Sequence, residues 1–224
     1  MKIENLDPQL EMMCNLLSEL EIEYCIDSGT LLGVVREGAL LERDRDIDIA
    51  ILENQQNKLI KLKSRLRDQG YKCRILSFYG QKFKFKFWCA SEKRSIDINI
   101  FRESQDNEKF ICPQTFPIIK NENPLFFYGR KIIRVVFGII KNIGSEFDLN
   151  DFPWRIGTCH LTWAIPKDHF SSFEHLSGQI YVPRKYEEYL TFRYGDWKTP
   201  NKNWNFRSDD MGLSQKFPSK FGCM

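Results

Sequence analysis

The spacing of hydrophobic and polar residues predicts three helices, over residues 7–20, 30–37 and 55–69. In the first stretch apolar residues recur at helical spacing, and Asp7 stands before it as an N-cap. The second helix is expected to follow a turn made by Ser28 and Gly29 and to end at Gly38. The third is expected to have Asn54 as its cap, with the Lys and Arg side chains on its solvated face.

Alternating apolar and polar residues predict strands between and after these helices. A short strand is expected over residues 23–27, and the run D-I-D-I-A-I-L over residues 46–52 places its isoleucines on one face. Residues 71–101 are expected to form three strands. The last two, over residues 82–87 and 96–101, are separated by a polar stretch that suits a hairpin loop.

The alternation in these two strands also predicts their register. Residues directly opposite in an antiparallel pair share a face, and a slip of one residue would mix polar and apolar side chains. The register with a wholly apolar face pairs Phe87 with Ile96, Phe85 with Ile98, Lys86 with Asp97 and Lys84 with Asn99. The polar face of the hairpin is then either a solvated surface with incidental ion pairs or a row of lysines beside an aspartate with a shared task.

Residues 125–143, L-F-F-Y-G-R-K-I-I-R-V-V-F-G-I-I-K-N-I, place basic side chains on one side of a helical projection and apolar ones on the other. This pattern fits an interfacial membrane helix, and it also fits a core helix or two strands. No stretch resembles a signal peptide or a spanning helix. We therefore expect a cytoplasmic protein, with peripheral contact at the inner face of the membrane under the first interpretation.

The composition is that of a globular protein. Of 224 residues, 42% are hydrophobic and 28% are charged, which argues against a disordered or coiled-coil chain. Lys and Arg number 33 against 30 Asp and Glu, so the net charge of +3 indicates no nucleic-acid partner. The seven cysteines are scattered without a C-x-x-C pair, which predicts free thiols rather than a zinc site.

Carboxylates carry the candidate chemistry. Asp46 and Asp48 stand two apart on a predicted strand and project to one face, and Asp97 stands on the polar face of another strand. Clustered acids repel one another unless a cation neutralises them, and oxygen ligands favour Mg²⁺ or Mn²⁺. Such ions usually serve phosphates. The pair Asp209 and Asp210, by contrast, is expected to lie in a solvated loop of a loop-rich C-terminal third, which also has a short helix near 184–194.

A phosphate site is expected upstream of the acids. Ser28, Gly29 and Thr30 make a tight turn that opens a helix, and the backbone N–H groups of a helix N-terminus bind phosphate. A turn of this kind, a D-x-D strand and a third acid on a later strand, in this order, resemble the nucleotidyltransferase fold of DNA polymerase β and its relatives.

Two longer strings sharpen the resemblance. Residues 24–51, Y-C-I-D-S-G-T-L-L-G-V-V-R-E-G-A-L-L-E-R-D-R-D-I-D-I-A-I, and residues 182–197, V-P-R-K-Y-E-E-Y-L-T-F-R-Y-G-D-W, resemble the two signatures of the LicD family. That family includes bacterial phosphocholine transferases, fukutin and fukutin-related protein. The resemblance covers roughly residues 20–104 and 177–200. Arg45 stands where the family commonly has an acid, while the spacing of Asp46 and Asp48 is kept.

The resemblance implies an α+β, nucleotidyltransferase-like fold with a mixed sheet, helices on one face and a loop-rich C-terminal extension. It divides the chain into a catalytic core (1–104), a variable insert with the basic amphipathic segment (105–176) and a signature segment that completes the same domain (177–224). It implies transfer of a phosphorylated alcohol, such as phosphocholine, ribitol phosphate or glycerol phosphate, from a CDP-activated donor to a sugar hydroxyl of a surface glycan or lipid-linked glycan. CMP would be released.

Each candidate residue has a role under this resemblance. Asp46 and Asp48 would bind Mg²⁺ or Mn²⁺, and Asp97 would complete the site or activate the acceptor hydroxyl. The donor's phosphates would be held by Ser28, Gly29, Thr30, Arg36, Lys84 and Lys86. Substrate contacts would come from Asp44, Tyr194, Asp196 and Trp197. The alternatives are an NTP-dependent nucleotidyltransferase that acts on a small molecule and a non-catalytic scaffold.

Overall fold

The structure is a computed structural model, and it describes residues 6–117, 146–148, 158–206 and 208–214. These residues form an α+β fold around a nine-stranded mixed sheet. Its main path runs β11-β8-β6-β5-β4-β3-β7, and β2 pairs with both β5 and β1. A separate hairpin is formed by β9 and β10. The strands are β1 (Cys25–Ile26), β2 (Asp46–Leu52), β3 (Lys72–Phe78), β4 (Gln81–Trp88), β5 (Ser95–Glu103), β6 (Lys109–Pro117), β7 (Glu146–Asp148), β8 (Thr158–Pro166), β9 (Phe173–Ser177), β10 (Ile180–Pro183) and β11 (Leu213–Ser214).

The helices follow the predicted order with two corrections. The helices are α1 (Pro8–Glu19), α2 (Ser28–Glu37), the 3₁₀ turn η1 (Glu53–Lys58), α3 (Leu59–Asp68), α6 (Lys167–Phe170) and α7 (Tyr186–Tyr194). The Asp7 cap of α1 is confirmed, because its side chain accepts hydrogen bonds from two backbone N–H groups. The end of α2 at Gly38, which has a positive φ of 69°, is confirmed as well.

Both corrections concern helix starts. Ser28 and Gly29 do not precede α2 as a turn but form its first residues, because Asp27 caps the helix by accepting from the Ser28 N–H at 2.6 Å. Asn54 does not cap α3, since it lies inside η1. This tighter turn is tied to β5, because the Arg102 guanidinium donates to the carboxylate of Glu53 at 2.8 Å.

The predicted hairpin register is confirmed. In the antiparallel pair of β4 and β5, Lys86 lies opposite Asp97 and Lys84 opposite Asn99, with Phe85 and Phe87 opposite isoleucines. The phenylalanines are completely buried or nearly so. On its other side β5 pairs in parallel with β2, which the local pattern does not specify. The two neighbours of β5 therefore bring lysines and aspartates onto one polar face.

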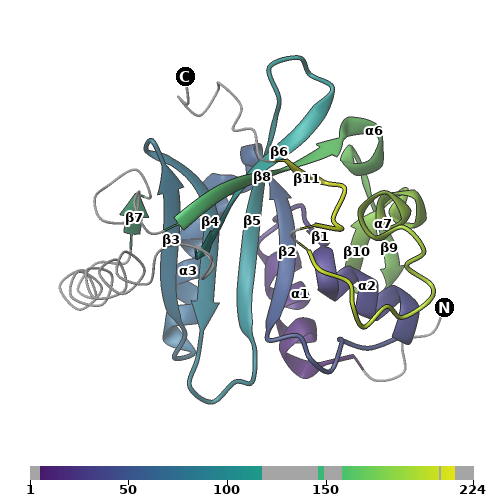
Figure 1. The fold of residues 1–224 in the computed structure, drawn as a ribbon. Helices are drawn as coiled ribbons and strands as arrows, with labels where there is room; N and C mark the ends of the chain where they lie inside the picture. The colour runs from purple at the N-terminus through teal and green to yellow at the C-terminus, as the bar shows by residue number, and fades with distance from the viewer. Residues whose placement is uncertain (1–5, 118–145, 149–157, 207, 215–224) are drawn as a thin grey trace, which may run out of the picture.

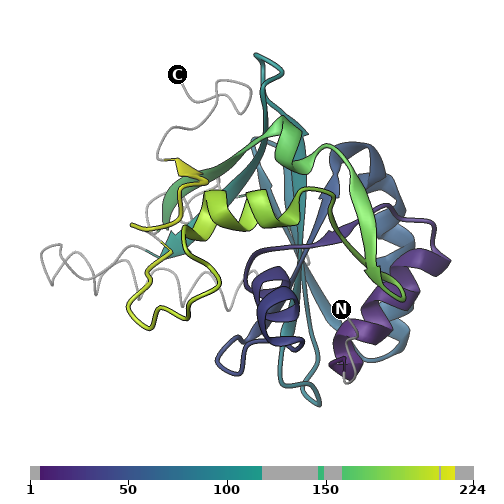
Figure 2. The same cartoon turned by 90° about the vertical axis from the view of Figure 1, so that its right-hand side faces the viewer.

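Helices lie on both sides of the sheet. Figures 1 and 2 show α1 and α3 against one face, whereas α2 and α7 lie toward the other side near β1 and β2. The sequence prediction of helices on one face is therefore wrong. The apolar side chains of α1, α3, β2, β4 and β5 form one buried core that also includes residues of α7 and β10.

The C-terminal third contains more regular structure than the sequence predicted. Strand β8 pairs with β6 over nine residues of each strand, and β9 and β10 make a hairpin. The helix predicted near 184–194 is present as α7 and ends before Gly195. The domain boundaries at 104 and 176 stay a prediction.

The basic amphipathic segment 125–143 lies outside the described residues, so its two interpretations stay open. Within the described ranges, every helix is too short or too polar to cross a bilayer.

Candidate functional site

A pocket of about 740 Å³ lies on the polar face of β2 and β5. It is bordered by α2, by the end of α7 and by the chain that follows α7. Eleven of the thirteen candidate residues line it: Ser28, Gly29, Arg36, Asp44, Asp46, Asp48, Lys84, Asp97, Tyr194, Asp196 and Trp197. The two signatures, far apart in sequence, therefore meet at one cavity.

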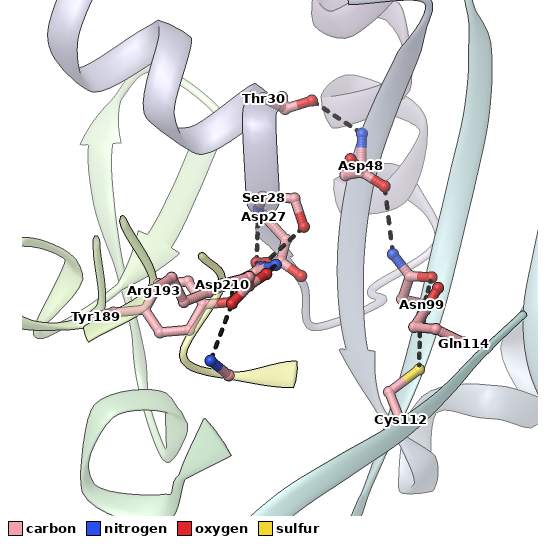
Figure 3. A network of polar contacts seen from close by, with 11 residues as sticks. Asp27, Ser28, Thr30, Asp48, Asn99, Cys112, Gln114, Tyr189, Arg193 and Asp210 are labelled. Atoms are coloured by element: carbon pink, nitrogen blue, oxygen red, sulfur yellow. Dashed lines mark hydrogen bonds and ion pairs between the residues drawn. The ribbon is translucent and has the colours of Figure 1, made fainter. Parts of the chain in front are cut away.

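The two remaining candidates lie beside the pocket. The hydroxyl of Thr30 accepts a hydrogen bond from the Asp48 backbone N–H at 2.9 Å, so it joins α2 to β2 (Figure 3). Lys86 forms an ion pair with Asp97, which lines the pocket. Both residues thus hold pocket residues in place.

The parallel pairing of β2 and β5 sets the geometry of the acids. Asp48 lies directly opposite Asp97, and Asp46 projects from the same face of β2 two residues earlier. One oxygen of Asp48 accepts a long hydrogen bond from the Asn99 amide at 3.4 Å (Figure 3). Asn99 is held in turn by Gln114 of β6, also at 3.4 Å.

Asp48 is half-buried and forms no ion pair with a described residue, although the positive charge of Lys84 lies near enough to attract it. Burial raises the pKa of this carboxyl well above its ordinary value, and the neighbouring charge of Asp46 raises it further. Neither Asp46 nor Asp48 forms an ion pair with any residue that the structure describes. This part of the pocket therefore favours a bound cation.

Asp97, unlike Asp48, forms ion pairs with two lysines. Its two oxygens bind the ammonium groups of Lys84 at 3.1 Å and Lys86 at 2.8 Å. Burial alone would raise the pKa of Asp97, but the two lysines outweigh it and hold the pKa below the ordinary value. Asp97 is therefore a charged, fully paired carboxylate.

The donor set of the pocket suits a metal ion that also binds the substrate. Across the described ranges no three His, Cys, Asp or Glu side chains form a ready-made metal centre. Asp46 and Asp48 still fit Mg²⁺ or Mn²⁺, since Mg²⁺ is commonly bound through one or two carboxylates, with waters and substrate phosphates as its other ligands. The pair would thus hold a metal together with a phosphorylated substrate, and the predicted cofactor stays a prediction.

The start of α2 forms the next wall of the pocket. A Cβ at Gly29 would overlap a carboxylate oxygen of Asp44, so glycine is what lets the Asp44 side chain approach the helix in this position. Burial raises the pKa of Asp44, and the charge of Asp46 adds to the effect. Arg36 lies in the last turn of α2. Its guanidinium donates to the backbone carbonyl of Trp197 at 3.3 Å and connects α2 to the second signature.

A buried network beside the pocket was missed by the sequence analysis. Arg193 of α7 is only 2% exposed, and its guanidinium donates to Ser28 Oγ at 2.9 Å and to the Tyr189 hydroxyl at 3.0 Å (Figure 3). It also lies 3.4 Å from Asp27 and forms a two-point ion pair with Asp210.

The expected solvated position of Asp210 is therefore wrong, whereas Asp209 is exposed. Asp210 is buried because it supplies the charge that Arg193 needs. The available signal was the helical spacing of Tyr189 and Arg193 inside the second signature.

The described cysteines agree with the expectation of free thiols. Those at positions 14, 25, 73, 89 and 112 form no disulfide.

Comparisons with known proteins match part of this chain. Residues 21–123 match the model of the LicD/FKTN/FKRP nucleotidyltransferase domain. An uncharacterised protein of Rickettsia typhi is 28% identical over 117 residues, which cover 52% of this chain and 33% of that protein. An uncharacterised protein of Rickettsia prowazekii is 28% identical over 135 residues, which cover 58% of this chain and 46% of that protein. The chain thus matches less than half the length of these relatives. The match places a LicD-family nucleotidyltransferase domain at residues 21–123, slightly less than half of this chain.

Proposed function

We propose that this protein is a metal-dependent phosphotransferase that acts on a glycan. It would transfer a phosphorylated alcohol from a CDP-activated donor to a sugar hydroxyl of a surface glycan or of its lipid-linked precursor. The observation that carries the proposal is the half-buried pair of Asp46 and Asp48, which forms no ion pair with a described residue and lines a pocket bordered by both family signatures. The family match supports the class of reaction.

The reaction requires one bond to form and one to break. The acceptor hydroxyl oxygen attacks the phosphorus that carries the alcohol, the bond from that phosphorus to the oxygen of CMP breaks, and the hydroxyl proton passes to a base. A metal on Asp46 and Asp48 would neutralise charge on the diphosphate. Negative charge develops on the leaving phosphate, and a lysine or arginine side chain stabilises such a charge.

The chain's own residues supply the remaining binding groups. Lys84 and Arg36 face the pocket as cations for phosphate oxygens. The N-terminus of α2 at Ser28 and Gly29 presents backbone N–H groups, which bind phosphate. The Y-G-D-W segment, with Tyr194 and Trp197, also lines the pocket, and its aromatic rings suit a base or an alcohol.

The test is release of CMP from CDP-choline, CDP-ribitol and CDP-glycerol, with CTP and ATP as comparison, in Mn²⁺ or Mg²⁺ and again in EDTA. We expect metal-dependent CMP release from one CDP-alcohol and its loss in Asp48→Asn. The exposed Asp68→Asn serves as the matched control and should retain wild-type turnover. Equal turnover in Asp48→Asn would remove Asp48 from the site.

The second candidate function is nucleotidyl transfer from an NTP to a small molecule, and the description of the matched domain as a nucleotidyltransferase domain favours keeping it. The same panel separates the two. Turnover of CTP or ATP alone, with every CDP-alcohol inert, would replace the phosphotransferase proposal.

The protein's location in the cell and its contact with a membrane stay predictions. A lipid-linked acceptor would fit the interfacial interpretation of residues 125–143, and binding to anionic vesicles would test that interpretation directly.

A further inference from the structure

The three acids of the predicted metal site are not equivalent. Asp46 and Asp48 form no ion pair with a described residue, whereas each oxygen of Asp97 already binds one ammonium group. A carboxylate oxygen that accepts a charge-assisted hydrogen bond from a lysine is a poor ligand for a cation, because the two positive charges would repel each other.

The two lysines are fixed where they stand. Both project from the polar face of β4, and the confirmed register sets Lys86 directly opposite Asp97. The Lys84 side chain is 13% exposed and the Asp97 side chain 6%, so solvent screens this pair little. The charge of Asp48, opposite Asp97 on β2, also favours the ammonium form of Lys84.

The net charge of this cluster also favours a single divalent ion. Three carboxylates and two ammonium groups leave one net negative charge, so a single divalent ion turns the cluster positive and suited to a diphosphate. A second divalent ion at Asp97 would have to lie beside the two ammonium groups that already bind its oxygens.

We propose that Asp97 is a positioning residue rather than a metal ligand. It holds Lys84 and Lys86 as two fixed cations, and the pocket takes one divalent ion, on Asp46 and Asp48. Lys84 then stabilises negative charge on the donor's phosphates, which is the part that a second metal plays in a two-metal site. This inference rests on the proposed function, since it assigns the neutralisation of the donor's phosphates to one metal ion together with Lys84 and Lys86.

The experiment counts and titrates Mn²⁺ alone, by electron paramagnetic resonance of the free ion, on the full chain. The wild type should bind one Mn²⁺ per chain. Lys84→Met should bind Mn²⁺ more tightly by at least about threefold, because a nearby positive charge is lost. Asp97→Asn should bind it more weakly, because two lysines are left without their anion.

The double variant Lys84→Met/Asp97→Asn decides between positioning and ligation. It removes one charge of each sign, so its net charge equals that of the wild type. If Asp97 only positions the lysines, the double variant should bind Mn²⁺ within about threefold of the wild type. If Asp97 is a ligand, affinity should fall by more than about tenfold, because losing a direct ligand costs at least as much as losing a hydrogen-bond partner of one. Asp97 is no such partner, since its two oxygens bind Lys84 and Lys86 and not Asp46 or Asp48.

Three results would overturn the inference: two Mn²⁺ per wild-type chain, a double variant weakened by more than about tenfold, or a Lys84→Met variant that binds no tighter than the wild type. Circular dichroism checks that each variant folds, and the wild-type count decides the matter if the double variant does not. Asp48→Asn is the control for the underlying site. If it binds Mn²⁺ as the wild type does, the proposed metal site fails, whatever the lysines do.

Discussion

Replacing Asp210 by asparagine removes the main counter-charge of a buried arginine. Arg193 is 2% exposed and Asp210 5%, and the two form a two-point ion pair. In Asp210→Asn the guanidinium keeps Asp27 at 3.4 Å, together with two neutral hydroxyl groups. The substitution keeps the size of the side chain and changes its charge, so the effect is electrostatic rather than a matter of packing.

The expected loss of stability is large. Breaking a buried ion pair by removing one partner costs about 3–5 kcal/mol, because the other charge is left poorly compensated. For a chain of this length, each kcal/mol lowers the melting temperature by roughly 2–4 °C, so a fall of about 6–20 °C is expected. Thermal unfolding followed by circular dichroism, with urea denaturation as a second measurement, gives this value.

The neighbouring Asp209→Asn is the matched control. Asp209 is exposed, and its two oxygens accept separately from the Asn205 N–H and the Ser208 hydroxyl, so an asparagine there keeps one of the two acceptors. Its effect should stay within about 0.5 kcal/mol. If Asp210→Asn were as mild as its neighbour, Arg193 would have its compensation elsewhere, and the account of the network in Figure 3 would be wrong.

Two further predictions concern α2 and Asp48. Gly29→Ala should displace the Asp44 side chain and weaken donor binding, while the melting temperature stays nearly unchanged. Gly33→Ala should lower stability by about 1–3 kcal/mol, because its Cβ would lie 2.7 Å from the Ala39 backbone oxygen. In EDTA at neutral pH, Asp48→Asn should melt higher than the wild type, because it removes a carboxyl whose charged form is disfavoured in the fold. Added Mn²⁺ should raise the melting temperature of the wild type only.

The stability advantage expected for Asp48→Asn should depend on pH. The folded pKa of Asp48 lies above its unfolded value, so its charge destabilises the fold as pH rises from the unfolded toward the folded pKa. Below the unfolded value the carboxyl is protonated in both states, and the advantage of Asp48→Asn should vanish there. An advantage independent of pH would contradict the electrostatic cause. Equal unfolding of Gly29→Ala and Gly33→Ala would contradict the distinction between a side-chain and a backbone contact.

The sequence by itself determined the features whose causes are local. The cap at Asp7 and the end of α2 at Gly38 depend on residues next to one another in the chain. The register of β4 and β5 was determined as well, because a short loop joins two alternating strands and only one register buries every phenylalanine. The long signatures named the family and most of the residues that line the pocket.

Only the tertiary structure decided which distant segments meet. The pattern of β2 says that Asp48 faces one side, but not that β2 lies parallel to β5 with Asp97 directly opposite. Nor does a local pattern show whether an aspartate is solvated or buried. Asp210 is buried because Arg193 on another element supplies its partner, and a buried charge is tolerated only where such a partner is brought to it.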